Sequence, residues 1–452
     1  MSVSTSSSSP LLSTLPPELV RDILAFAISS SLLTQPIVVH GQFAQLPSTC
    51  RTCCYRQVAS ICSTFADIVR RDYLGRDVVF GVYGSAKDDE VLACVEKHVE
   101  RARQVRSIDA SLRGWQGWRS LPTVGAVDEP NEEGSVGFLE TREVQLEKQR
   151  RQVLERERQR LVRLLTACTL IESFDVDVGF YNSIRGFPTL FPSSIRSLTL
   201  RNAEGQETFD LIENLPLLDD LTLRLALDWR LSPLQPRPRP TCRLRRFELS
   251  FTAFATTRLE DVLTLLSSSL ESVESLTLRN KGSSAESFES FLPVSRGLIA
   301  ALAPHLRQLV VKDIPRAGVR CPGTIPTWSW FPPRPTAFPS LQVLHLTGLP
   351  SLTAEVLQTT LVLADPAKLE VLTLEDFDSP SPAYLVETLT KSPALSRLKR
   401  LRVAVPKRGT DKTDGERDVE AWCEGVGKVD GRKVELDASW RMRKVDHHCG
   451  MW

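Results

Sequence analysis

One six-residue sequence, Ser-Leu-Thr-Leu-Arg-Asn, occurs twice in the chain, at residues 197–202 and 275–280. Both copies belong to a longer frame with apolar residues at its first, fourth and sixth positions: Ile195, Leu198 and Leu200 in one copy, and Val273, Leu276 and Leu278 in the other. The same frame recurs through most of the C-terminal two-thirds of the chain. An internal repeat constrains the fold more than any single segment does, because each repeat has to bury its apolar residues against its neighbours.

Ten segments match this frame, and their spacing is close to regular. The matches begin at Val105, Ile171, Ile195, Leu218, Leu244, Val273, Leu306, Leu341, Leu369 and Leu398. From the second match onward, successive matches are 24, 23, 26, 29, 33, 35, 28 and 29 residues apart. This spacing is typical of leucine-rich repeats with loops inserted between some of the units.

Segments with a helical pattern lie between the matches, at Asp88–Arg103, Arg142–Thr166, Leu259–Leu266, Leu298–Leu302, Ala354–Leu363 and Ala383–Thr390. A strand, a turn and a helix repeated in this order predict an α/β leucine-rich-repeat solenoid, with parallel strands on the concave face and helices on the convex face. We predict this solenoid over residues 77–440, with a first strand at 77–80, a last strand at 433–436 and a C-terminal tail at 441–452.

The frame also predicts which side chains lie on the concave surface. The apolar residues of each strand point into the core, and the residues between them point outward. Because parallel strands pair at a spacing of ~4.8 Å, equivalent positions form columns across the sheet. The first column is Asp177, Arg201, Arg224, Ser250, Arg279, Lys312, Thr347 and Glu375, and the second is Asp175, Thr199, Thr222, Glu248, Thr277, Val310, His345, Thr373 and Arg402.

Four cations occupy the middle of the first column: Arg201, Arg224, Arg279 and Lys312. They span five strands, or roughly 20 Å. We predict that these residues contact a target, and that an acidic or phosphorylated segment of the target lies along them, because Arg pairs with phosphate through two hydrogen bonds. The alternative is an ordinary solvated surface that Asp220 and Glu248 partly neutralise.

A long Pro-rich loop at Pro322–Pro339 carries Trp328 and Trp330. Aromatic residues on loops are favoured at binding hot spots, so we include both tryptophans among the candidate target-binding residues. The alternative is a rigid loop that packs its own aromatic side chains on the solenoid.

The N-terminal part of the chain has a different character. Residues 1–12 are Ser-rich and predict a disordered tail. A helix is predicted to begin at the Pro16-Pro17 pair, with apolar residues at helical spacing after it. A second helix is predicted from Val58 to Val69, and a polar segment at about 29–54 separates the two.

The segment from Leu15 to Leu24, Leu-Pro-Pro-Glu-Leu-Val-Arg-Asp-Ile-Leu, resembles the opening of an F-box. Residues 58–69 and 73–79 resemble its second half and its exit into a leucine-rich-repeat domain. The resemblance predicts an F-box-like module over residues 13–76, although the insertion of about 25 residues at 29–54 departs from the family pattern. Adaptor-binding residues carried over from the family are Leu15, Pro16, Leu19, Ile23, Leu24, Val58, Ile61 and Phe65.

The resemblance implies a non-catalytic substrate receptor of a cullin-type ubiquitin ligase. In that family the F-box binds a Skp-type adaptor, which connects it to the cullin, while the repeats bind the target protein. Two alternatives stay open. One is a repeat scaffold whose F-box is degenerate and has no role in ubiquitin transfer. The other is an enzyme that uses the concave surface.

Composition and motifs weigh against several other classes. With 56 Lys and Arg against 55 Asp and Glu, the chain gives no reason to expect binding to nucleic acid or to a membrane. No nucleotide-binding or catalytic motif is present, so we predict neither enzymatic activity nor a cofactor.

Cys50-x-x-Cys53-Cys54 has zinc-like spacing but lacks a second pair of ligands, so no metal site is predicted. Ten scattered cysteines and the lack of a secretory signal predict a cytoplasmic or nuclear location.

Overall fold

A computed structural model of the protein describes residues 77–79, 85–110, 148, 152, 155–178, 191–202, 204–225, 229–231, 240–253, 255–282, 285–313, 337–347, 364–365, 368–375, 399–404 and 435–437. The chain divides into two compact units. The first comprises Met1–Glu143 and Gln159–Phe174, and the second comprises Val144–Arg158 and Asp175–Trp452. The predicted tails and the predicted module at 13–76 lie outside the described residues.

In the first unit, two short strands pair in parallel: β1 at Asp77–Val79 and β2 at Ser107–Ala110. Two helices, α4 at Ser85–Lys97 and α5 at Val99–Gln104, lie between these strands in the sequence. The sequence predicted a single helix here, but the backbone of His98 leaves the helical region, with φ −124° and ψ 88°. A further helix, at residues 155–167, ends in this unit and buries Leu161, Leu164 and Leu165.

Nine strands of the second unit form one all-parallel ladder. They are β4 (Ser197–Arg201), β5 (Asp220–Leu225), β6 (Arg246–Ala253), β7 (Ser275–Gly282), β8 (Gln308–Asp313), β9 (Val343–Thr347), β10 (Val371–Glu375), β11 (Arg400–Ala404) and β12 (Glu435–Asp437). Each strand pairs in parallel with the next strand in the chain. A preceding strand, β3 at Ser173–Asp177, contains the division between the units. The parallel sheet predicted from the repeated frame is therefore confirmed.

The same backbone contact recurs at the entrance of seven successive strands of this sheet. The first residue of a strand and the residue before it both donate their N–H groups to the carbonyl that directly precedes the previous strand. Asp219 and Asp220 do so to the Arg196 oxygen, at 2.8 and 2.9 Å. The same two hydrogen bonds are found at the starts of β6, β7, β8, β9, β10 and β11. A contact that repeats with the sequence frame shows that each unit is joined to its neighbour in the same way.

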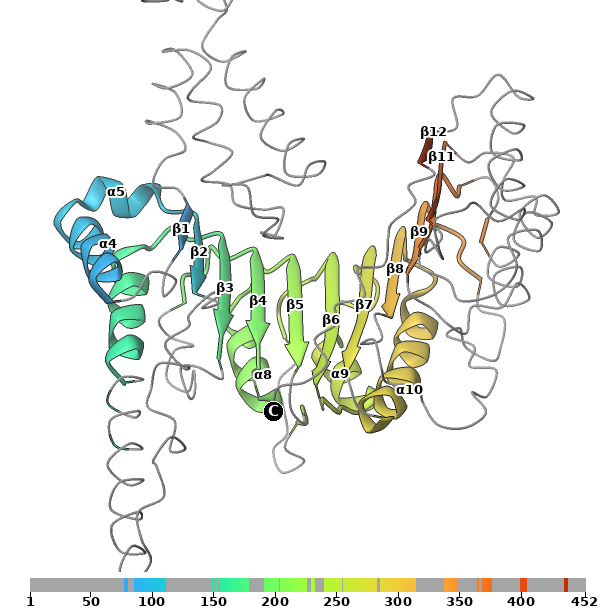
Figure 1. Ribbon diagram of the computed structural model, residues 1–452, viewed down its shortest axis with the longest axis horizontal. Helices are drawn as coiled ribbons and strands as arrows, with labels where there is room; N and C mark the ends of the chain where they lie inside the picture. Colours follow the sequence, from blue (N-terminus) through green and yellow to red (C-terminus); the bar gives the residue numbers. More distant parts are fainter. Residues whose placement is uncertain are drawn as a thin grey trace, which may run out of the picture. The chain divides into compact units, whose positions relative to one another are not determined.

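Three helices of the second unit cover the apolar face of its sheet: α8 (Gly205–Glu213), α9 (Leu259–Leu265) and α10 (Ala285–Leu302). In Figure 1 they lie on one side of strands β4–β8. The rings of Phe251 on β6 and Phe291 on α10 meet edge to face, with centroids 4.9 Å apart. The sequence pattern indicated only the end of α10 and did not indicate α8.

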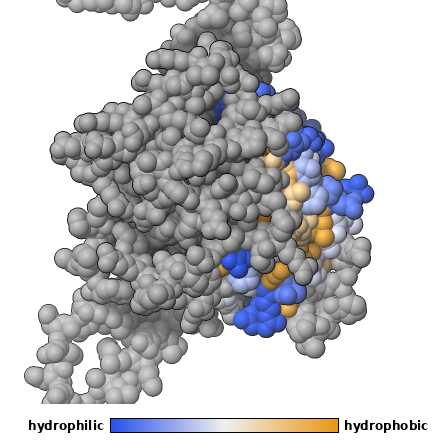
Figure 2. Space-filling model, turned by 90° about the vertical axis from the view of Figure 1, so that its right-hand side faces the viewer, coloured by the Kyte–Doolittle hydropathy of each residue, from blue (hydrophilic) through white to orange (hydrophobic). Residues whose placement is uncertain are grey.

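The core of the sheet consists of the apolar residues of the repeated frame. Leu198, Leu221, Leu276 and Leu309 are all 0% exposed. Complete burial of one such side chain contributes about 1.5–3 kcal/mol. Outside the core, Figure 2 shows hydrophobic side chains among hydrophilic ones on the described part of one face, as is usual for a protein surface. Of the described helices, none is long and apolar enough to cross a membrane.

Candidate functional site

The side chains between the buried positions of β4–β11 form the polar face of the sheet. Buried and partly exposed residues alternate along β4 and β5, whereas Val310 on β8, Thr347 on β9 and Thr373 on β10 are buried. The paired residues of successive strands are Arg201 with Arg224, Arg224 with Ser250, Ser250 with Arg279, and Arg279 with Lys312. The four cations that the sequence placed in one column therefore do lie in register, and we call them the basic column.

The second predicted column is also in register. Thr199, Thr222, Glu248, Thr277, Val310, His345, Thr373 and Arg402 pair in this order from β4 to β11. The two columns lie next to each other on every strand, two residues apart. A long side chain in the basic column can therefore reach the second column on the preceding strand.

Arg201 makes this contact with Asp175 on β3. Its Nε donates to Asp175 Oδ1 at 3.0 Å, and its Nη2 donates to Oδ2 at 2.6 Å. The two side chains are only 14% and 19% exposed. Two parallel hydrogen bonds hold the guanidinium plane in one orientation, so this pair is more specific than a single surface ion pair.

Arg279 makes a similar ion pair three strands further along, with one hydrogen bond instead of two, because its buried Nε does not meet Glu248 Oε1 in hydrogen-bonding geometry. Its Nε lies 3.0 Å from Glu248 Oε1, and its Nη2 donates to Oε2 at 3.2 Å. The carboxylate again belongs to the second column of the preceding strand, here β6. The two arginines are those of the two Ser-Leu-Thr-Leu-Arg-Asn copies, so the repeated sequence forms a repeated ion pair.

These ion pairs change the predicted charge of the basic column. Carboxylates neutralise Arg201 and Arg279, and Glu248 is one of the two acidic residues expected to do this. The other, Asp220, instead accepts a hydrogen bond from Arg246 at 3.0 Å, outside the column. Burial raises the pKa of Asp220, and Arg246 partly opposes that shift. Sequence spacing did not identify Asp175 as the partner of Arg201, because neither residue's rotamer follows from spacing.

Hydroxyl groups and an imidazole occupy the polar face on β9 and β10. His345 Nε2 and Thr347 Oγ1 are 2.8 Å apart, and Thr373 pairs with His345 in the sheet. Thr347 and Thr373 are nearly buried, at 6% and 8% exposed. This contact holds the imidazole beside a hydroxyl group.

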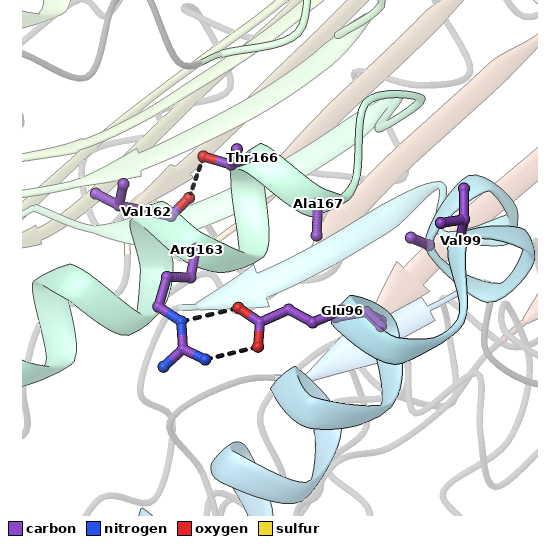
Figure 3. A pocket seen from close by; sticks show the side chains of 8 residues that line it. Glu96, Val99, Val162, Arg163, Thr166 and Ala167 are labelled. Atoms are coloured by element: carbon purple, nitrogen blue, oxygen red, sulfur yellow. Dashed lines mark hydrogen bonds and ion pairs between the residues drawn. The ribbon is translucent and has the colours of Figure 1, made fainter.

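A pocket of about 330 Å³ lies in the first unit, between α4, α5 and the helix at 155–167. Figure 3 shows the Arg163 guanidinium meeting the Glu96 carboxylate there, with bonds of 2.8 and 2.6 Å. The hydrogen bond to Glu96 raises the pKa of Arg163. The other lining residues are Val95, Val99, Ala102, Val162, Thr166 and Ala167. The pocket is mainly apolar and its two charges neutralise each other, and sequence analysis did not identify it.

The remaining predicted site residues lie outside the described residues. They are Leu15, Pro16, Leu19, Ile23, Leu24, Val58, Ile61, Phe65, Trp328 and Trp330. Within the part of the chain that the structure describes, no three His, Cys, Asp or Glu side chains are grouped so that they could hold a metal ion.

Comparisons with known proteins add no family assignment. No protein-family model matches the chain, and no curated protein matches it. The class defined by the fold is a mixed α/β protein with a parallel, repeat-built sheet. The resemblance to F-box and leucine-rich-repeat proteins therefore depends on the sequence alone, namely on residues 15–24, 58–69 and 73–79 and on the repeated frame.

Proposed function

We propose that this protein is a leucine-rich-repeat substrate receptor of a cullin-type ubiquitin ligase, with an F-box-like module that binds a Skp-type adaptor. The observation that carries the proposal is the strand entrance repeated seven times along an all-parallel sheet. Such repeats produce an extended surface on which side chains from many strands face one partner. The protein itself would perform no chemistry, and catalysis would follow from bringing a target close to the ubiquitin-charged enzyme.

The polar face supports a role in protein recognition. Arginine is over-represented in protein interfaces, and oriented guanidinium groups lose little conformational entropy on binding. Arg201 and Arg279 are oriented in this way by Asp175 and Glu248. Fold alone does not define function, so the ligase role depends on the F-box resemblance at Leu15–Leu24.

Adaptor binding tests the proposal directly. The full chain would be co-expressed with a Skp-type adaptor and purified through the adaptor. We expect capture of the wild type, and loss of capture for Leu19→Ala combined with Ile23→Ala. A matched control, Arg21→Ala with Asp22→Ala, changes polar residues of the same segment and should be captured normally. Absence of wild-type capture, or capture that both variants share, would overturn the ligase role.

The alternative is a protein-interaction scaffold with a degenerate F-box. The insertion at about 29–54 favours it, because the two halves of the module are usually close in sequence. A chain that binds a target through the polar face but never binds the adaptor would establish this second function. The adaptor experiment above therefore separates the two.

A further inference from the structure

We infer that Arg201 and Arg279 form a two-point site for an extended segment of a partner protein that carries two carboxylate side chains four residues apart. This inference rests on the target-binding role proposed for the polar face, and it specifies the chemistry of the target.

Both arginines are bound to their internal carboxylate through the same edge. Nε and Nη2 of Arg201 contact Asp175, and Nε and Nη2 of Arg279 contact Glu248. Neither Nη1 makes a hydrogen bond or ion pair with any residue in the described part of the chain. The guanidinium group has five N–H donors, so the edge formed by Nη1 and Nη2 keeps the geometry that receives a second carboxylate.

Both groups also reach the surface. The side chains of Arg201 and Arg279 are 14% and 32% exposed. Because the internal carboxylates already restrict the long side chains, a ligand would order few additional bonds when it binds. The two available edges are thus oriented before a partner arrives.

The sheet sets the distance between the two points. Arg201 is on β4 and Arg279 is on β7, and the register places Arg224 and Ser250 between them in the same column. Three strand spacings correspond to about 14 Å, and an extended chain rises ~3.4 Å per residue. Carboxylates at positions i and i+4 of a segment that crosses the strands therefore match the two arginines. Side chains an even number of residues apart also lie on the same side of an extended segment.

The charge of the polar face favours an acidic partner. Outward residues of β4–β8 include five cations, namely Arg201, Arg224, Arg246, Arg279 and Lys312. On β3–β6 the outward residues Asp175, Asp177, Asp220 and Glu248 supply four carboxylates against them. The face keeps a positive excess that attracts an acidic segment, while the paired arginines determine where its carboxylates bind.

The internal carboxylates also favour a carboxylate over a phosphate. Each guanidinium already contacts one negative group, and a ligand on its other edge lies close to that group. A phosphorylated residue carries about −1.5 to −2 at pH 7. Its attraction to the guanidinium and its repulsion from Asp175 or Glu248 grow together, whereas its desolvation beside these partly buried pairs costs more than that of a singly charged Glu or Asp. The structure thus narrows the acidic or phosphorylated target predicted from sequence to an acidic one.

Fluorescence anisotropy with purified full-length protein tests the inference. The probes are labelled ten-residue Ser/Gly peptides with two Glu residues at i and i+4, or with the same two Glu residues at i and i+1. A third probe carries phosphoserines at i and i+4. We expect the i, i+4 Glu peptide to bind at least tenfold more tightly than the i, i+1 peptide. Equal affinity of the two Glu peptides, or tighter binding of the phosphoserine peptide, would overturn the inference.

Variants test the two arginines without removing their charge. Arg201→Lys with Arg279→Lys keeps an ion pair to each internal carboxylate but lacks the second donor edge. We expect it to lose at least tenfold in affinity for the i, i+4 peptide and to lose the spacing preference. Arg246→Lys, on the same face but outside the basic column, is the matched control and should bind as the wild type does. Circular dichroism and thermal melts would verify that all variants are folded.

The outcome is independent of the ligase role. If the adaptor captures the chain while the two Glu peptides bind equally, the recognition chemistry is wrong and the proposed function stands. If the i, i+4 preference holds without adaptor binding, the recognition chemistry stands and the ligase role is wrong.

Discussion

Ser269 and Leu244 are joined across 25 residues by a buried hydrogen bond, in which the backbone N–H of Leu244 donates to Ser269 Oγ at 3.0 Å. The same Oγ lies 3.3 Å from the carbonyl oxygen of Cys242. Ser295 on α10 is equally buried, at 0% exposed, yet its Oγ has no hydrogen-bond partner among the described residues. Two serines of equal burial therefore differ in whether the hydroxyl is paired.

This difference predicts opposite responses to alanine. Ser269→Ala leaves a buried N–H without its acceptor, so we expect a loss of about 1–3 kcal/mol in the free energy of unfolding. Ser295→Ala removes an unpaired hydroxyl, and we expect a change of less than about 0.5 kcal/mol or a gain in stability. Urea denaturation of both variants measures the difference. Equal destabilisation by the two substitutions would contradict the assignment.

Gly205, the first residue of α8, lies against the backbone of Arg230. A Cβ at this position would be 2.6 Å from the Arg230 carbonyl carbon, closer than non-bonded atoms approach. Because the obstacle is backbone rather than a flexible side chain, Gly205→Ala should cost about 1–3 kcal/mol in unfolding free energy. Gln206→Ala, one residue further along the same helix, is the control and should have little effect. A stable Gly205→Ala protein would show that this contact is not tight in solution.

Cys168 and Cys242 predict a loss of stability in alkaline solution. Burial raises the thiol pKa of both residues to about 11, from 9.0. Above pH 9 the unfolded chain loses these protons and the folded chain keeps them, so stability falls as pH rises from about 9 to 11. The loss is at most about 3 kcal/mol per thiol. Unfolding free energies at pH 8 and pH 10.5 measure it.

Alanine variants isolate this contribution from the titration of other groups. Cys168→Ala combined with Cys242→Ala should show a smaller decrease in stability between pH 8 and pH 10.5 than the wild type. Alkylation of the native protein at pH 8 supplies a second check, because a protonated buried thiol reacts slowly. Rapid modification of either cysteine under native conditions would contradict the prediction.

The two asparagines that end the repeated hexapeptide should tolerate different substitutions. Asn202 has φ 57°, and its Nδ2 donates to Asp177 Oδ1 at 3.0 Å. Asn280 lies within β7, paired with Phe251 and Asp313. Glycine accepts the left-handed conformation and alanine does not, so Asn202→Gly should be about 1 kcal/mol more stable than Asn202→Ala.

The order should reverse at Asn280, where the backbone is an ordinary strand. Asn280→Ala should be more stable than Asn280→Gly, because glycine loses more backbone entropy in a strand. Thermal or urea denaturation of the four variants gives the comparison. The same order at both positions would mean that the two backbones do not differ as described.

Much of the sheet was predictable because its determinants are local. Alternation along a strand depends only on neighbouring residues, and identical frames pair without an offset when strands are parallel. Pairs such as Arg279 with Lys312 therefore followed from counting. Helices were less predictable. The segment that forms α8 begins with Gly205 and has few apolar residues, so its helical state depends on packing.

The candidate site was predictable in position but not in its interactions. Arg201 and Arg279 were placed on the correct face and column, whereas their ion pairs with Asp175 and Glu248 join residues 26 and 31 positions apart. Such pairs require the strand register and the side-chain rotamers together. Arg163 and Glu96, 67 positions apart, were beyond any local pattern.

The repeated hexapeptide separates what the sequence determined from what the tertiary structure decided. The sequence determined that both copies form strands with two buried leucines and an outward arginine, because these features follow from short-range alternation. Only the tertiary structure decided how each copy ends. After Arg201, β4 stops and Asn202 turns into the left-handed region, whereas β7 continues through Asn280 to Gly282. Identical residues diverge because β7 is paired beyond this point by β6 on one side, up to Ala253, and by Asp313 of β8 on the other.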